Sequence, residues 1–81
     1  MQLENVSNTI QKGMQEYQNN TFFLANYIKC NLATRAKISS LISENGKIEG
    51  LGLQVLVDNE IGDGVAYIGM GNGPTFATIQ I

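Results

Sequence analysis

The distribution of glycine divides the chain into two parts with different structural potential. Gly13 is the only glycine before residue 46, and the other eight lie between Gly46 and Gly73. The segment between Gly13 and Gly46 also lacks proline, so it suits helix, and the segment after it suits strands and turns. With 81 residues, the chain is too short for two hydrophobic cores. The sequence therefore predicts a single α+β domain over residues 1–81.

The first part of the chain has the apolar spacing of an amphipathic helix. A helix over about 3–18 would place the following apolar residues on one face: Leu3, Val6, Ile10, Met14 and Tyr17. Gly13 lies inside this segment and weakens a helix by about 1 kcal/mol relative to Ala. We expect Gly13 to allow a close approach between this helix and its neighbour.

A second helix is predicted over about 21–44, and Asn45-Gly46 is a favourable left-handed stop. Most apolar residues of this segment share one broad arc of a helix. Asn31, Thr34 and Arg35 fall in the same arc, where apolar residues are expected. Two interpretations follow: the helix breaks near residues 31–34, or it is continuous and carries a polar island on its inward face.

After Gly46 the apolar period changes from about 3.6 to 2, which is typical of strands. Strands are predicted near 51–58, 64–70 and 75–81. The connections between them are short, which favours a three-stranded antiparallel meander, because a parallel crossover needs a dozen residues or more. The last strand, Thr75–Ile81, has no charged side chain to protect it as a sheet edge.

Charge and residue type exclude several classes of function. The chain has five Lys and Arg, seven Asp and Glu, and a net charge of -2, so a binder of duplex nucleic acid is not expected. It has no His and one Cys, which excludes a zinc site or a disulfide within one chain and removes the usual general base. We expect no catalytic residues, no metal and no cofactor. Cys30 is expected to be a small buried residue.

No apolar run approaches the roughly 20 residues that span a bilayer, and the start of the chain lacks the pattern of a secretion signal. The expected location is therefore cytoplasmic, with no membrane partner.

Two short motifs resemble ligand sites but fit turns better. Gly69, Gly71 and Gly73 form G-x-G-x-G, but Pro74 and a β-like run follow, so no helix N-terminus is present to meet a phosphate. The carboxylates of Asp58, Glu60 and Asp63 do not match the spacing of an EF-hand. A glycine-rich hairpin turn and a solvated acidic turn are the simpler interpretations.

Arg35 is the residue that most directly suggests a ligand, because a guanidinium offers planar donors to phosphate or carboxylate. A buried guanidinium needs a partner, which is an acidic side chain from Glu49, Asp58, Glu60 or Asp63, a neighbouring subunit, or a bound anion. In the ligand hypothesis backbone amides close around the anion and a tyrosine stacks on a base. The predicted ligand-binding residues are Asn31, Thr34, Arg35, Tyr27, Tyr67, Gly71, Asn72 and Gly73.

The sequence favours a non-catalytic, homo-oligomeric binding protein that sequesters a small anionic or nucleotide-like ligand. Small size without catalytic groups fits the accessory proteins of phages and other mobile elements. The alternative is a protein-binding inhibitor or adaptor that acts through an apolar face or through its C-terminal edge strand.

Overall fold

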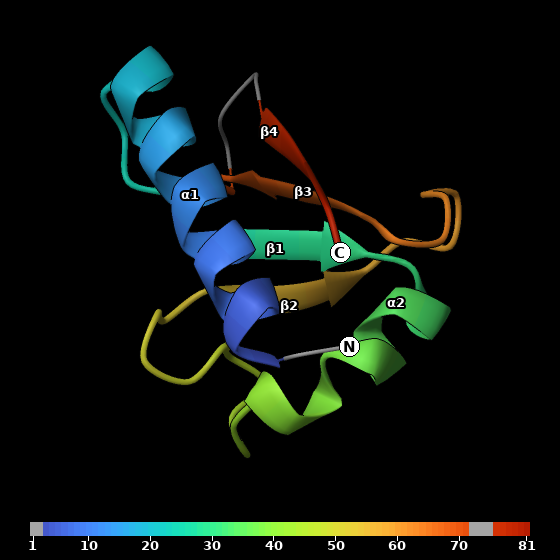
Figure 1. Cartoon of the computed structure of the whole chain (residues 1–81). Helices are drawn as coiled ribbons and strands as arrows, with labels where there is room; N and C mark the ends of the chain where they lie inside the picture. The colour runs from blue at the N-terminus through green and yellow to red at the C-terminus, as the bar shows by residue number, and fades with distance from the viewer. Residues whose placement is uncertain (1–2, 72–75) are drawn as a thin grey trace.

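A computed structural model describes residues 3–71 and 76–81 of the chain (Figure 1). It contains, in order, α1 (Leu3–Thr21), β1 (Tyr27–Cys30), α2 (Leu32–Lys37), a 3-10 turn η1 (Ser39–Leu41), β2 (Gln54–Val57), β3 (Val65–Gly69) and β4 (Phe76–Gln80). The predicted α+β class is confirmed, and so is the position of the first helix. Strands are present within each of the three segments predicted to form them.

α1 packs against β3 and β4 through the face that the spacing predicts. Its side chains Val6, Ile10 and Tyr17 are buried. A Cβ added at Gly13 would lie 2.7 Å from Ile79 Cγ2 and 2.8 Å from Ile68 Cδ1. Real Cβ atoms do not approach other atoms so closely, so Gly13 is what lets α1 lie this near the sheet.

The prediction of one helix over 21–44 is wrong. Residues Tyr27–Cys30 form the strand β1, and only Leu32–Lys37 are α-helical before the short turn η1. The chain leaves the strand at Asn31, whose side chain caps α2 by accepting a hydrogen bond from Thr34 N at 2.8 Å. The interpretation in which the helix is broken near 31–34 is therefore the correct one. Gly46 does adopt a left-handed backbone, with φ of 80°, but in a turn well after the end of α2.

The predicted three-stranded meander is also wrong, because β1 lies between β2 and β3. The sheet has four strands in the order β2-β1-β3-β4. β1 pairs in parallel with β2, as Ile28 with Val55, and antiparallel with β3, as Ile28 with Ile68. β3 and β4 are antiparallel neighbours, as the short connection predicts. β4 is an edge strand, and its five residues carry no charge.

The hydrophobic core lies between α1, α2 and one face of the sheet. It includes the fully buried Ile28 and Cys30 of β1 and Ile38, which follows α2. Burial of Cys30 confirms the expectation for that residue. None of the helices in residues 3–71 and 76–81 combines the length and apolarity needed to cross a membrane.

Candidate functional site on the open face of the sheet

The two faces of the sheet have different environments. In β1, Ile28 and Cys30 are buried, and Tyr27 and Lys29, which alternate with them, are only half-buried. In β3, Ile68 is buried and Tyr67 is half-buried. Since side chains alternate between the faces of a strand, one face contacts the helices and the other carries Tyr27, Lys29 and Tyr67. In Figure 1 α1 lies across the first of these faces.

We call the second surface the open face. By strand register it carries nine side chains: Tyr27, Lys29, Gln54, Leu56, Val65, Tyr67, Phe76, Thr78 and Gln80. An outward face of a two-layer sheet is ordinarily polar. Here three of the nine side chains are aromatic and two are aliphatic, and all nine are half-buried or exposed. Exposed apolar groups gathered in this way mark surfaces that bind something.

The aromatic rings of the open face lie on three neighbouring strands, β1, β3 and β4. Tyr67 stands beside Lys29 on one side and Thr78 on the other. Its ring centroid is 4.3 Å from that of Phe76, with an angle of 34° between the ring planes. Gly69, which is itself buried, lies between Tyr27 and Phe76 across the sheet.

Lys29 is the only charged member of the open face. Its Nζ lies 5.5 Å from the centroid of the Tyr27 ring, a distance at which the ring attracts the ammonium group. Burial of the Tyr27 hydroxyl, with a further contribution from Tyr17, raises the pKa of Tyr27 above its ordinary value. A tyrosine phenol is neutral at neutral pH, so Lys29 makes the face locally positive although the chain is acidic overall.

Asn31 and Thr34 have structural hydrogen-bond partners. The amide of Asn31 donates to Ile61 O at 3.0 Å and to Asp63 Oδ1 at 2.5 Å. The hydroxyl of Thr34, which is fully buried, accepts from Gly64 N at 2.9 Å. These contacts tie the start of α2 to the loop between β2 and β3.

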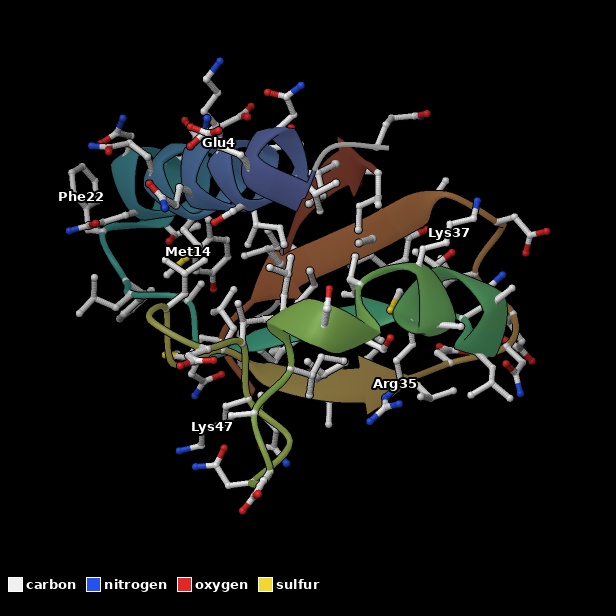
Figure 2. All side chains as sticks on the ribbon, turned by 60° about the horizontal axis from the view of Figure 1, so that its bottom comes forward. Glu4, Met14, Phe22, Arg35, Lys37 and Lys47 are labelled. Carbon is white, nitrogen blue, oxygen red and sulfur yellow. The ribbon has the colours of Figure 1, made fainter. Side chains whose placement is uncertain are left out.

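Arg35 is half-buried on α2, which contacts β2, and lies apart from the labelled residues of α1 (Figure 2). Within residues 3–71 and 76–81 it forms no ion pair with Glu49, Asp58, Glu60 or Asp63. The prediction for Arg35 assumes a continuous helix over 21–44 with this residue on its apolar arc. The observed helix α2 has six residues, which is too short to form that arc.

The predicted glycine amides are described only in part. Gly71 N donates to Asn26 Oδ1 at 3.0 Å, so an intramolecular acceptor already uses this amide. Asn72 and Gly73 lie outside the described residues. Among the six predicted site residues that the structure describes, Tyr27 and Tyr67 share one face of the sheet, whereas Asn31, Thr34 and Arg35 lie together at the start of α2.

Sequence reasoning missed Lys29 and Phe76 as members of this surface. A signal for both was present. Tyr27 and Lys29 alternate with Ile28 and Cys30, and Phe76 alternates with Ala77 in the last strand. The strand period is hard to recognise in the first case, because β1 has only four residues and lies in a stretch whose apolar residues also share one helical arc.

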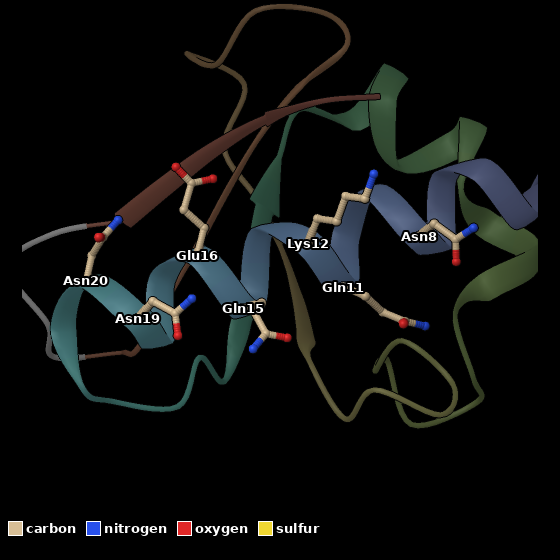
Figure 3. A pocket seen from close by; sticks show the side chains of 7 residues that line it. All are labelled: Asn8, Gln11, Lys12, Gln15, Glu16, Asn19 and Asn20. Atoms are coloured by element: carbon tan, nitrogen blue, oxygen red, sulfur yellow. The ribbon is translucent and has the colours of Figure 1, made fainter.

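A surface depression of about 590 Å³ lies elsewhere, along the outer side of α1 (Figure 3). All seven residues that line it belong to this one helix: Asn8, Gln11, Lys12, Gln15, Glu16, Asn19 and Asn20. A space bounded by long side chains of a single helix changes shape as they rotate, so we assign no site to it. No group of three His, Cys, Asp or Glu side chains within the described residues is placed to hold a metal ion.

Comparisons of the chain with models of protein families, with curated proteins and with solved structures find no match in any of the three.

Proposed function

We propose that the protein binds a nucleotide-like ligand, a planar base carrying a phosphate, on the open face of its sheet and performs no catalysis. The observation that supports this proposal is the gathering of Tyr27, Tyr67 and Phe76 with Lys29 on the face of the sheet opposite α1. The compartment proposed for this binding is the cytoplasm, as the sequence leads us to expect.

Each part of the ligand has a matching group on the open face. A base stacks on an exposed aromatic ring, which contributes about 1–3 kcal/mol per base. The Tyr67–Phe76 pair offers one such platform, and Tyr27 offers another across Gly69. The ammonium group of Lys29 lies 5.5 Å from the centroid of the Tyr27 ring, on the residue that pairs with Tyr67, and meets the phosphate as a point charge.

The proposal is tested by titrating the protein into a fluorescently labelled single-stranded hexanucleotide, followed by anisotropy. Calorimetry with AMP and UMP is the second arm and shows whether a free nucleotide suffices. Tyr67→Ala removes the ring and is expected to weaken binding by about tenfold, whereas Tyr67→Phe keeps the ring and the affinity. Lys29→Gln is expected to weaken binding, and Lys12→Gln on the outer side of α1 is its matched control.

Salt dependence separates this face from an ordinary basic surface. One lysine that neutralises one phosphate gives a slope of about −0.7 for single strands, hence about a threefold loss of affinity between about 50 and 200 mM salt. A much steeper slope requires phosphate contacts with other lysines or arginines and would contradict the proposal. So would equal affinities of Tyr67→Ala and the unmodified protein, or no binding in either arm.

A further inference from the structure

The segment between α1 and β1 exposes three large apolar side chains in a row. Phe22 is 90% exposed, Phe23 52% and Leu24 69%. Figure 2 shows Phe22 projecting from the end of α1. Burying such side chains is the main favourable term in folding and association, and the folded monomer leaves these three in water.

The backbone of Phe22 adds a second, independent observation. Its φ is 64°, which makes it the only non-glycine residue with positive φ in the described part of the chain. Phe22 N donates to Gln18 O at 2.8 Å, so the residue closes the C-terminal end of α1. Glycine is the usual residue in this left-handed position, and a bulky residue there is strained. The folded monomer therefore gains nothing evident from having Phe rather than Gly at position 22.

A hollow of about 320 Å³ lies beside this segment. It is lined by Gln11, Met14, Gln15, Gln18, Leu24, Ala25 and Leu51. The lining is entirely uncharged, with apolar side chains from α1, from the segment before β1 and from the loop before β2. In contrast to the depression on the outer side of α1, three separate parts of the chain build this hollow.

We infer that Phe22, Phe23 and this hollow form a self-complementary surface whose occupant is a second copy of the chain. In a two-fold dimer the same surface of each copy meets that of the other. The projecting rings of one copy can then enter the apolar hollow of its partner, and the reverse contact forms at the same time. The surface carries no charge, so two copies of an acidic chain meet there without repulsion. The glutamines at the rim each have a donor and an acceptor, which lets identical rims pair with each other. The inference is independent of the ligand proposed for the open face.

Sedimentation equilibrium over about 1–500 μM measures the association. The unmodified protein is expected to form dimers, and Phe22→Gly to raise the dissociation constant by about tenfold or more. Thermal unfolding of Phe22→Gly, measured at a concentration where both proteins are monomeric, is expected at the same or a higher midpoint, because the left-handed strain is relieved. A purely structural role for Phe22 would instead lower the unfolding midpoint of the monomeric Phe22→Gly variant.

Two further samples complete the test. Leu51→Glu places a charge in the hollow of each copy and is expected to abolish the dimer. Phe76→Ser removes a ring of the open face that is 51% exposed, close to the 52% of Phe23, and is expected to leave the dimer intact. The inference is overturned by a monomer throughout the concentration range, by dimers of Phe22→Gly as tight as those of the unmodified protein, or by loss of the dimer only in Phe76→Ser. Nucleotide titration of Phe22→Gly separates this result from the fate of the open-face proposal.

Discussion

Replacing Gly13 with Ala sets two opposing effects against each other in α1. Alanine is the better helix former by about 1 kcal/mol, so the substitution would stabilise an open helix. In this structure the new Cβ would lie 2.7 Å from Ile79 Cγ2 and 2.8 Å from Ile68 Cδ1. Carbon atoms are in favourable contact at about 3.5–4.0 Å, and overpacking a core costs about 1–3 kcal/mol.

The destabilisation caused by the clash is expected to exceed the stabilisation from the higher helix propensity of alanine. Ile79 Cγ2 is a branch at Cβ, so its position is fixed by the strand and by a stiff χ1, and it cannot swing away as a chain end can. This places the overpacking penalty in the upper part of its range. After subtraction of the gain in helix propensity, the free energy of unfolding of Gly13→Ala should fall by about 1–2 kcal/mol.

Urea denaturation followed by far-UV circular dichroism measures this change. Gln15→Ala, on the exposed side of the same helix, is the control and is expected within about 0.5 kcal/mol of the unmodified protein. Adding Ile68→Val to Gly13→Ala removes the Cδ1 atom, so the two substitutions should couple favourably by about 0.5 kcal/mol or more. If Gly13→Ala instead gains the full helix-propensity term, α1 does not lie against Ile68 and Ile79. The assignment of the open face would then fall with it.

Two further predictions concern α2 and the core. Asn31→Ala removes the cap of α2 and the hydrogen bonds to Ile61 and Asp63. Its free energy of unfolding, measured in urea, should therefore fall by about 1–3 kcal/mol. A loss below about 0.5 kcal/mol would contradict the assigned contacts. Burial raises the pKa of the Cys30 thiol, and the charge of Arg35 opposes this only in part. Because the folded thiol holds its proton more tightly than the unfolded one, its contribution to stability is complete below the unfolded pKa of about 8.5 and is lost as pH rises above it. Iodoacetamide should therefore label Cys30 slowly in the native protein and rapidly in urea, and equal rates would be inconsistent with burial.

The fold could be predicted where local pattern and tertiary packing agree. α1 repeats the helical period over five turns, and no other structure would bury Val6, Ile10 and Tyr17 together. The run that contains β1 is different, because four residues are too few for periodicity to separate strand from helix. What decides in favour of a strand is hydrogen bonding to β2 on one side and β3 on the other. Both partners are distant in sequence, so a local pattern does not contain them.

The candidate site was predictable to a smaller extent. Asn31 and Thr34 stand out in an apolar context, and the structure gives them hydrogen bonds that cap α2 and anchor a loop. Tyr27 and Tyr67 were identified as aromatic groups, but their common surface depends on the register of β1 against β3. Register is a tertiary property, so Lys29 joins them only after the sheet is known.

Both proposals rest on residues that the folded monomer does not require. The core side of the sheet fixes Ile28 and Ile68, and alternation then exposes Tyr27 and Tyr67 on the other side. Threonine would suit an exposed strand position, and the Tyr67–Phe76 contact itself contributes only about 0.5–1.5 kcal/mol. In the same way glycine would suit the left-handed backbone at Phe22 better than a large ring does. These side chains contribute little to the stability of the isolated chain, and we propose that they contact a molecule outside it.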